Sequence, residues 1–264
     1  MKNRLFLKNS AGYAFGLLAI VALVSGCATT ANQNPRDPWE GWNRNVHGFN
    51  KGFDDYVAKP VAKGYQWVTP SFVDMGVTNF FSNIQDIGVT LNDLMQAKFK
   101  QGGSDGTRFL INSVLGIGGL FDVATMLEFE KHEEDFGQTL GAWGIPTGPY
   151  IVIPILGPSS ARGITGLVGD AAMNPLTYID PAAVPLATGA LRFIDVRADL
   201  LSASRIAEEA AVDRYDFDRN AYLQRRRYLV YDGNVPLDEE DLDEELFDEE
   251  LDNEDDLESD TPEI

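Results

Sequence analysis

The chain of 264 residues carries a formal net charge of −20, and this charge is distributed unevenly. Residues 238–264 contain seventeen Asp or Glu and no Lys or Arg, which leaves 24 acidic against 21 basic residues in the rest of the chain. A run this dense in like charges cannot bury enough apolar surface to fold alone, so residues 233–264 are expected to form a disordered acidic tail. Nothing basic and clustered suggests a nucleic-acid partner, apart from Arg225–Arg227, which is expected to face solvent or anionic groups at a helix end.

The N-terminus has the pattern of a bacterial lipoprotein signal peptide. Three basic residues open it, namely Lys2, Arg4 and Lys8. An apolar run over residues 11–24 follows, and it leads into the lipobox Val24-Ser25-Gly26-Cys27. We therefore expect residues 1–26 to be removed and Cys27 to carry a thioether diacylglycerol and an N-acyl chain.

Cys27 is the only cysteine, so the mature chain can form no internal disulfide. Several acyl chains on it give a stable anchor, because each buried methylene contributes roughly 0.8 kcal/mol. The alternative is an ordinary secreted protein with one odd thiol. Residues 27–36 then form a short lipidated tether, and Ala28 after the cysteine is typical of lipoproteins sorted to the outer membrane.

Asp37 and Pro38 predict the start of an amphipathic helix, with Asp37 as the N-cap. Large apolar residues then recur at spacings of three and four, which places them on one face. They are Trp39, Trp42, Val46, Phe49, Phe53, Tyr56 and Val57. Buried packing explains such a stripe, but Trp and Tyr also favour the membrane interface, and both readings stay open. Pro60 predicts the end of this helix.

The rest of the body also reads as mostly helical. Helices are expected over residues 61–70, from Ser71 towards Lys100, 108–115, 159–174, 191–213 and 218–230, with turns at Gly102-Gly103 and at 116–119. Ser159 is the predicted N-cap of the fourth of these helices. Strand alternation is weak, and the one candidate strand, residues 150–156, is interrupted by Pro154.

Residues 136–161 contain no charged residue. Glycines and prolines interrupt this segment nine times, so it cannot form the regular run of about 20 apolar residues that a transmembrane helix needs. It is expected to be a tightly turned segment, either packed in the core or at membrane depth where protein covers its backbone.

Tests for catalytic and metal motifs are negative. The sequence around Ser159-Ser160 lacks the last glycine of G-x-S-x-G, and Phe121 replaces the third glycine of a dinucleotide-binding loop that would start at Gly116. Residues 216–227 fail as a calcium loop. Residues 133–135 are read as a solvated charge cluster and His132 as a member of a surface ion pair. We therefore expect no enzyme, no metal and no cofactor.

What remains is a lipid-anchored helical body with unusual apolar surfaces. Moving a phospholipid requires a polar path for the head group beside an apolar path for the tails, and helices with one apolar and one polar face supply both. Composition and periodicity thus favour a protein that handles an amphiphile without cleaving it.

Several motifs, in order along about residues 37–232, resemble the MlaA (VacJ) family of outer-membrane lipoproteins. They are Asp37-Pro38-Trp39-Glu40-Gly41-Trp42-Asn43-Arg44, Phe49-Asn50, Lys59-Pro60-Val61-Ala62, Val77-Thr78-Asn79-Phe80-Phe81, Arg108-Phe109-Leu110-Ile111-Asn112-Ser113, Gly116-Ile117-Gly118-Gly119, Asp122-Val123-Ala124, Glu134-Asp135-Phe136-Gly137-Gln138-Thr139-Leu140-Gly141, Gly148-Pro149-Tyr150 and Leu156-Gly157-Pro158-Ser159. The acidic tail and residues 126–132 match no family motif.

The resemblance implies a single helical domain over residues 37–232, shaped as a ring in the inner leaflet of the outer membrane, with an amphipathic channel. It implies that phospholipids mislocalised to the outer leaflet pass through this channel to a soluble periplasmic lipid carrier, and that a trimeric porin is a partner. The candidate lipid-contact or channel residues are Trp39, Trp42, Phe49, Asn50, Asn79, Phe80, Phe136, Gly137, Gln138 and Tyr150. The alternatives are an envelope lipoprotein that scaffolds a porin or other complex without handling free lipid, and a lipid-cleaving enzyme, against which the missing nucleophile argues.

Overall fold

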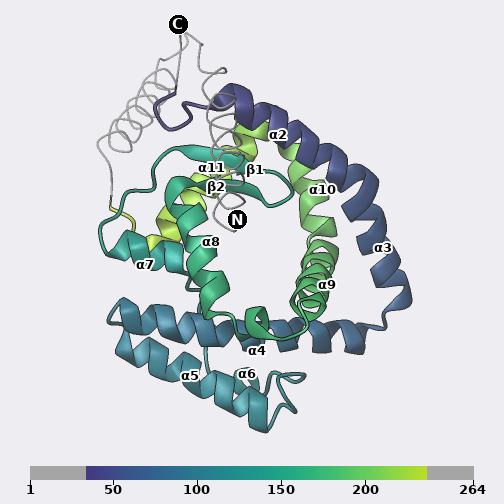
Figure 1. The fold of residues 1–264 in the computed structure, drawn as a ribbon, viewed down its shortest axis with the longest axis vertical. Coiled ribbons are helices and arrows are strands. Elements are labelled where there is room, and N and C mark those ends of the chain that lie inside the picture. Colours follow the sequence, from purple (N-terminus) through teal and green to yellow (C-terminus); the bar gives the residue numbers. More distant parts are fainter. Residues whose placement is uncertain (1–33, 237–264) are drawn as a thin grey trace, which may run out of the picture.

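The computed structural model describes residues 34–236, which are mostly helical (Figure 1). The predicted signal peptide, Cys27, most of the tether and nearly all of the predicted acidic tail lie outside the described residues. No described helix is both long enough and apolar enough to cross a membrane.

The elements follow one another in a simple order. They are α2 (Glu40–Phe53), the π turn η1 (Asp54–Ala58), α3 (Lys59–Val68), α4 (Ser71–Met95), α5 (Phe99–Val114), α6 (Val123–Met126), α7 (Phe136–Ala142), β1 (Tyr150–Ile153), β2 (Gly157–Ser160), α8 (Ala161–Met173), the 3₁₀ turn η2 (Pro175–Tyr178), α9 (Ala183–Asp199), α10 (Leu201–Ala210) and α11 (Arg214–Val230). The two strands pair antiparallel, Tyr150 opposite Ser160 and Ile153 opposite Gly157.

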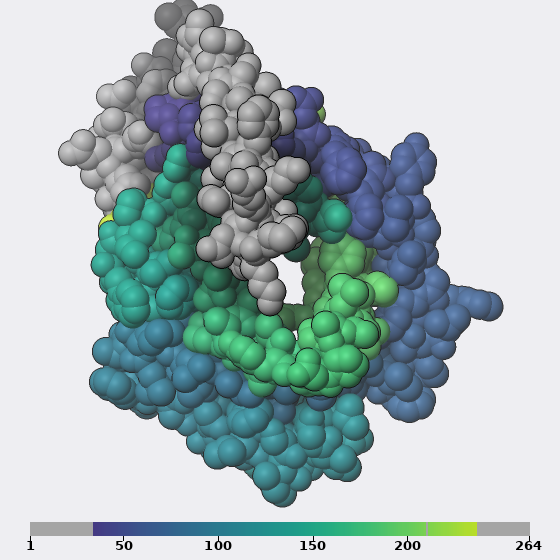
Figure 2. All heavy atoms as spheres, in the orientation of Figure 1, coloured from purple at the N-terminus to yellow at the C-terminus, as the bar shows by residue number. Residues whose placement is uncertain are grey.

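Most of these elements lie around a central space (Figure 1). Helices α2 and α3 run along one side and α4 crosses at the base, while α8 and the β1–β2 hairpin form the opposite side; α9 and α10 lie inside α3. Helix α5 packs on the outer side of α4, and α6 packs against α5. The space-filling view shows an opening within this circuit, next to the light-green segment of the chain (Figure 2).

The start of α2 differs from the prediction. The helix begins at Glu40, after Trp39, and Asp37 is not its N-cap. The Asp37 side chain is instead buried, where it accepts hydrogen bonds from Asn43 Nδ2, at 2.8 Å, and from the Tyr215 hydroxyl. A buried carboxylate requires such partners, so Asp37 joins the N-terminal segment to α11 rather than capping a helix.

The prediction that Pro60 ends the first helix is wrong. The chain continues from α2 through η1 into α3, and Pro60 lies in the first turn of α3. In η1 the amide of Lys59 donates to the carbonyl of Asp54, five residues earlier. The shift to π spacing begins a new set of helical hydrogen bonds at Lys59, and proline is tolerated in a first turn because its missing N–H needs no partner there.

The turn predicted at Gly102-Gly103 is also wrong, because both residues lie within α5. A Cβ on Gly102 would lie 3.0 Å from the Cβ of Asp93 in α4. The glycine therefore allows a close approach of two helices instead of a change of direction. The predicted helix over residues 108–115 and the break over 116–119 are confirmed.

The last third of the chain departs from the prediction in its boundaries. The cap of α8 is Ser160, whose Oγ accepts from the amide of Gly163 at 3.0 Å, and Ser159 belongs to the unpredicted strand β2. The helix predicted over residues 191–213 is two helices, α9 and α10, which meet at Leu200. Helix α11 begins four residues before the predicted start.

Polar contacts join segments that are far apart in sequence. Arg197 of α9 binds Asp54 of η1 through two hydrogen bonds, Nε–Oδ1 of 2.6 Å and Nη2–Oδ2 of 2.8 Å. The buried carboxylate of Asp195 accepts from Tyr65 of α3 and Thr78 of α4. Helix α9 is thus held to both α3 and α4 by groups that face the interior.

Candidate functional site

The described residues place polar groups inside and large apolar groups outside. Sixteen polar or charged residues are buried, against eleven hydrophobic ones, and Arg108 is the largest fully buried side chain. In a water-soluble domain the buried set is mainly apolar, so buried charge and exposed large apolar surface are the informative deviations. The compact apolar cluster at Val46, Tyr150, Val152 and Tyr215 is small.

Large apolar residues are exposed on most elements of the fold, and two groups of them are close together in sequence. The first, on α2, η1 and α3, contains Trp39, Trp42, Phe49, Tyr56, Val57, Val61, Trp67 and Val68. The second, around α5 and α6, contains Phe99, Leu110, Val114, Leu115, Ile117, Leu120, Phe121, Met126 and Leu127. Of the two readings left open for the stripe on α2, buried packing applies to Val46 and in part to Phe53, whose ring packs on Phe193, whereas Trp42 is 48% and Tyr56 86% exposed.

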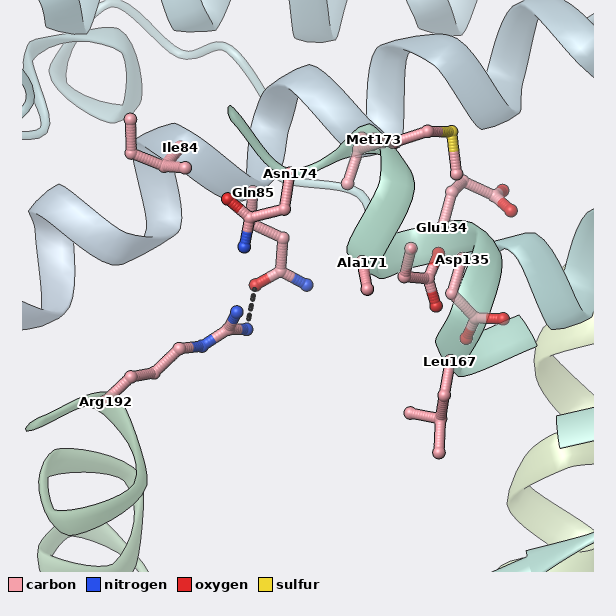
Figure 3. A pocket seen from close by; sticks show the side chains of 12 residues that line it. Ile84, Gln85, Glu134, Asp135, Leu167, Ala171, Met173, Asn174 and Arg192 are labelled. Carbon is pink, nitrogen blue, oxygen red and sulfur yellow. Dashed lines mark hydrogen bonds between the residues drawn. The ribbon is translucent and has the colours of Figure 1, made fainter. Parts of the chain in front are cut away.

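The main cavity lies where α4, α8 and α9 meet, and we call it the Arg192 cavity (Figure 3). Its volume is about 420 Å³. Its lining comprises Ile84, Gln85, Gly88, Val89, Glu134, Asp135, Leu167, Asp170, Ala171, Met173, Asn174 and Arg192. Arg192 reaches from α9 towards Gln85 of α4, while Glu134 and Asp135 lie on the other side of the cavity (Figure 3).

Three smaller cavities continue from it. The Leu176 cavity, of about 210 Å³, shares Ile84, Asn174 and Arg192 with it. The Tyr222 cavity, of about 190 Å³, shares Asp135, Leu167 and Asp170 on the opposite side. The His47 cavity, of about 160 Å³, shares Pro158 with the Tyr222 cavity. Shared lining residues therefore link the four cavities in one series, from α9 past α8 to α2.

A larger hollow of about 680 Å³ lies elsewhere, on the outer side of the α4–α5 hairpin at Lys98 and His132. It is a broad surface depression. His132 Nδ1 lies 2.9 Å from the carboxylate of buried Asp105 and its Nε2 lies 3.9 Å from exposed Glu130. His132 thus contacts two carboxylates, and the nearer one, Asp105, is buried rather than at the surface where the partner was predicted.

The interpretation of residues 133–135 as a solvated cluster is wrong for two of the three. Glu134 is buried and its Oε1 lies 2.7 Å from Lys98 Nζ. Asp135 accepts from Arg226, with Nη2 2.9 Å from Oδ1, and also caps α7 by accepting from the amide of Gln138. Only Glu133 is exposed, paired with Arg225 at 2.6 Å. The acidic residues 133–135 and the basic residues 225–227, which were predicted as two separate clusters, therefore bind each other.

The Asp135–Arg226 contact also favours the ionised form of Asp135, which lines the Arg192 cavity. Burial opposes ionisation of Asp135, but the hydrogen bonds and positive charge of Arg226 outweigh it and lower the pKa of Asp135. Arg162, buried nearby, donates to the carbonyl of Ile145 at 2.8 Å, and burial followed by repulsion from Arg226 lowers its pKa.

Asp170 and Arg192 both line the Arg192 cavity, and among the described residues neither has an ion-pair partner like that of Asp135. Asp170 Oδ1 accepts the amide of Phe136 at 2.8 Å, and burial is the main cause that raises the pKa of Asp170 to about 6. Arg192 Nη2 donates to Gln85 Oε1 at 3.1 Å. Neither forms an ion pair within residues 34–236.

The residues predicted to contact lipid lie in different parts of the structure. Trp39, Trp42 and Phe49 are exposed on α2. Asn50 bridges to the hairpin, donating to the carbonyl of Ile153 and accepting from the amide of Ile155, and it lines the His47 cavity. Asn79 donates to the carbonyl of Leu120 at 3.1 Å.

The remaining predicted residues lie deeper. Phe80 and Phe136 are half-buried, with ring contacts to Phe81 and Trp143 respectively. Gly137, Gln138 and Tyr150 are buried, and Tyr150 is 0% exposed. All three are covered by protein atoms in this structure, and their contact with lipid stays a prediction.

Sequence reasoning missed Gln85, Asp170 and Arg192. A signal was present for the last, because Arg192 is the only basic residue between Arg162 and Arg197, in a segment rich in apolar residues. A charged side chain that is removed from water needs a partner or a polar cavity. No pattern in the sequence shows that α4 brings Gln85 opposite to it.

The fold and its cavities define a class: a mostly helical protein with a polar interior, exposed apolar surfaces and amphipathic cavities at its centre. The chain belongs to the MlaA lipoprotein family, whose model matches residues 35–229. This confirms the resemblance found in the motifs.

Known relatives agree with this membership. The chain is 33% identical over 221 residues to the intermembrane phospholipid transport system lipoprotein MlaA of Escherichia coli K12, covering 81% of this chain and 86% of that protein. It is 32% identical over 234 residues to the protein of the same description from Haemophilus influenzae, covering 86% and 93%. An uncharacterized protein of Rickettsia felis is 36% identical over 195 residues, covering 74% and 78%.

A solved structure described as "Structural basis for maintenance of bacterial outer membrane lipid asymmetry" is also similar, with a TM-score of 0.67 at 31% identity. The match covers 74% of this chain and 98% of that chain. The family is one of lipid-transport lipoproteins rather than of enzymes.

Proposed function

We propose that this protein removes mislocalised phospholipids from the outer leaflet of the outer membrane and passes them to a soluble periplasmic lipid carrier, maintaining the lipid asymmetry of that membrane. Membership of a family of intermembrane phospholipid transport lipoproteins supports the general function. The observation that supports the path is the series of four cavities, linked by shared lining residues, from α9 past α8 to α2.

The distribution of polarity supports a position within a leaflet. The exposed apolar side chains on α2, α3 and α5 are compatible with contact to acyl chains, while the buried charges Asp86, Asp105 and Arg108 of α4 and α5 have partners inside the protein. Trp39 and Trp42, close to the chain's expected anchor at Cys27, suit the boundary between head groups and tails. The elements around the central space then form a ring in the inner leaflet, and Cys27 holds it at the periplasmic side.

The cavities provide both surfaces that a phospholipid needs. Ile84, Leu167 and Met173 supply apolar walls, and Gln85, Asp170 and Arg192 supply charged or hydrogen-bonding groups. The lipid therefore moves with its head group along the polar side. No covalent bond has to change, so no nucleophile or cofactor takes part. A trimeric porin, suggested by the family resemblance, is the proposed membrane partner.

Blocking the path tests this proposal. A Cβ on Gly189 of α9 meets no heavy atom within 4 Å, and Gly189 lines the Leu176 cavity, so Gly189→Trp fills the path without displacing the backbone. The matched control is Leu186→Trp, at a position on the same helix that is 76% exposed and lines none of these cavities. Phospholipid would be quantified in the full-length lipoprotein purified from membranes.

We expect about one phospholipid per wild-type molecule, a large loss in Gly189→Trp and none in Leu186→Trp. A protein that is free of phospholipid yet bound to a porin would support the alternative, a scaffold that does not handle free lipid. Release of fatty acid from pure phospholipid would instead support the enzyme.

A further inference from the structure

We propose that the Arg192 cavity is a head-group site that selects zwitterionic, amine-bearing phospholipids, with Arg192 and Gln85 holding the phosphate and Asp170 holding the ammonium. This inference rests on the proposed function and adds to it the class of lipid that the cavity prefers. It depends on the contrast between these residues and the other charged groups of the same path.

Arg192 is the cation available to an anionic ligand. Its only hydrogen bond within residues 34–236 is to the neutral amide of Gln85, at 3.1 Å, and no carboxylate of this part of the chain lies within 4 Å of it. By contrast, Arg226 is bound to Asp135 and Arg214 to Asp218 (Nε–Oδ1 2.8 Å). Lys51 is bound to Asp55 at 2.9 Å. A guanidinium with free donors binds phosphate oxygens through charge-assisted hydrogen bonds, often two at once.

Asp170 is the corresponding anion. The other two carboxylates of the cavity are neutralised, Asp135 by Arg226 and Glu134 by Lys98. Asp170 accepts the backbone amide of Phe136 at 2.8 Å and has no ion-pair partner among the described residues, so its carboxylate can still accept from an ammonium group. With a pKa of about 6 it is largely ionised at neutral pH. The titratable groups that face it are Asp135 and Arg226, with the amide of Asn92 alongside.

The two charges remain separate within one cavity. They are more than 4 Å apart, since no ion pair joins them within the described residues, yet both line the same space of about 420 Å³. That volume lies in the range of small-ligand sites. A phosphoethanolamine head group carries its phosphate and its ammonium at the two ends of a short two-carbon linker, so in this proposal it places one charge on each of these two residues. An anionic head group satisfies only Arg192.

The acyl chains have a place beside the head group. The Leu176 cavity, which shares Arg192, is lined by Phe81, Leu176 and Pro185. A lipid with its phosphate on Arg192 can lay the first part of its tails along this apolar wall. Burial of each methylene there contributes about 0.8 kcal/mol irrespective of the head group. The tails therefore add binding free energy that is the same for every head group, and Asp170 determines which head group is preferred.

The test is a competition in which the purified, full-length lipoprotein is incubated with vesicles of equal phosphatidylethanolamine and phosphatidylglycerol. Bound lipid is then extracted and quantified by mass spectrometry. At pH 7.5 we expect the wild type to be enriched in phosphatidylethanolamine and Asp170→Asn to lose that enrichment, because an amide retains the acceptor for Phe136 but has no charge. Lowering the pH to 5 should give wild type the same lack of preference, since Asp170 is then protonated.

Arg192→Gln should bind about tenfold less of both lipids, the effect of losing one charge-assisted hydrogen bond, and Arg192→Lys, which keeps the charge but not the paired donors of the guanidinium, should bind an intermediate amount. The matched controls are Arg205→Gln and Glu209→Gln, an exposed pair on α10, 4.0 Å apart, that lines none of these cavities. Wild type and both controls should behave alike.

Each outcome is decisive. Equal enrichment in wild type and Asp170→Asn, or unchanged binding in Arg192→Gln, would overturn this inference while leaving the proposed function in place. Absence of any bound phospholipid from the wild type would refute both. If Asp170→Asn does not fold, the pH dependence of the wild type alone carries the test of the amine site.

Discussion

Asp135 and Arg226, 91 residues apart, form an ion pair in which Nη2 of the arginine lies 2.9 Å from Oδ1 of the aspartate. The same carboxylate caps α7, so one side chain starts a helix and holds α11 against it. The neighbouring pair, Glu133 and Arg225, has the same charges and a similar sequence separation but is exposed. Comparing these two pairs therefore measures how much burial adds to the contribution of an ion pair to the free energy of unfolding.

Asp135→Asn should lower the free energy of unfolding by roughly 2–3 kcal/mol, because it leaves the mostly buried Arg226 without its counter-charge. Glu133→Gln should change it by less than about 0.5 kcal/mol, since exposed ion pairs contribute little. Urea unfolding in detergent, followed by tryptophan fluorescence, measures both. Equal losses in the two variants would mean that burial of the pair is unimportant.

The buried side chain of Asn43 joins three segments. It donates to Asp37 at 2.8 Å and to the carbonyl of Tyr150 at 3.1 Å, and accepts from the amide of Val152 at 2.8 Å. Asn43→Ala leaves these buried groups unsatisfied and should cost about 3 kcal/mol. Asn45→Ala, two residues away and exposed, should be neutral within about 0.5 kcal/mol. Thermal unfolding of both variants in detergent checks the difference; a stable Asn43→Ala protein would contradict the assignment.

Replacing glycine by alanine at two positions, Gly166 and Gly48, is expected to change the stability of the protein in opposite directions. A Cβ on Gly166 of α8 would lie 2.8 Å from the backbone nitrogen of Gly137, so Gly166→Ala should separate α8 from α7 and destabilise the protein. A Cβ on Gly48 of α2 meets nothing within 4 Å, so Gly48→Ala should stabilise by about 0.5–1 kcal/mol through helix propensity. The melting temperatures should therefore shift in opposite directions. A shift of the same sign in both would disprove the close contact.

A buried carboxylate predicts how stability varies with pH. Burial, followed by the charges of Asp105 and Glu134, raises the pKa of Asp93, and neither Asp93 oxygen has a hydrogen-bond partner in the part of the chain that is described. Because the folded state then binds the proton more tightly than the unfolded state, this group's contribution is fully present below its ordinary pKa of about 4. It is lost as pH rises through the raised value.

Asp93→Asn should therefore raise the melting temperature at pH 8 and reduce the fall in melting temperature between pH 5 and pH 8. The control, exposed Glu209→Gln, should follow the wild-type curve. Differential scanning calorimetry in detergent at several pH values gives both curves. Parallel curves for wild type and Asp93→Asn would show that Asp93 titrates normally.

Much of the fold is predictable because helix periodicity and breakers are local signals. The apolar stripe on α2, the break over residues 116–119 and the end of α8 before Asn174 can be read directly from the sequence. Local signals failed where a residue serves a distant partner. Asp37 has the position of an N-cap but binds Tyr215, and Gly102 has the composition of a turn but allows α5 to approach Asp93.

The cavities were less predictable than the helices, for the same reason. Asn50, predicted from the family motif, lines the His47 cavity, whereas Tyr150 is in the core. Gln85 and Arg192 are separated by 107 residues, and only the packing of α9 near α4 brings them together. Residue type indicates that Arg192 needs a polar environment, but the identity of that environment is a property of the tertiary structure.

The central claim is that the protein clears phospholipid from the outer leaflet, and it is tested most directly in intact cells with and without the gene. Surface phosphatidylethanolamine would be labelled with an amine reagent that does not cross the outer membrane. We predict more label in the deletion strain, a return to the normal level with the wild-type gene and no return with Cys27→Ala, which removes the expected anchor. Unchanged labelling in a deletion strain whose envelope is otherwise altered would contradict the claim and favour a scaffold.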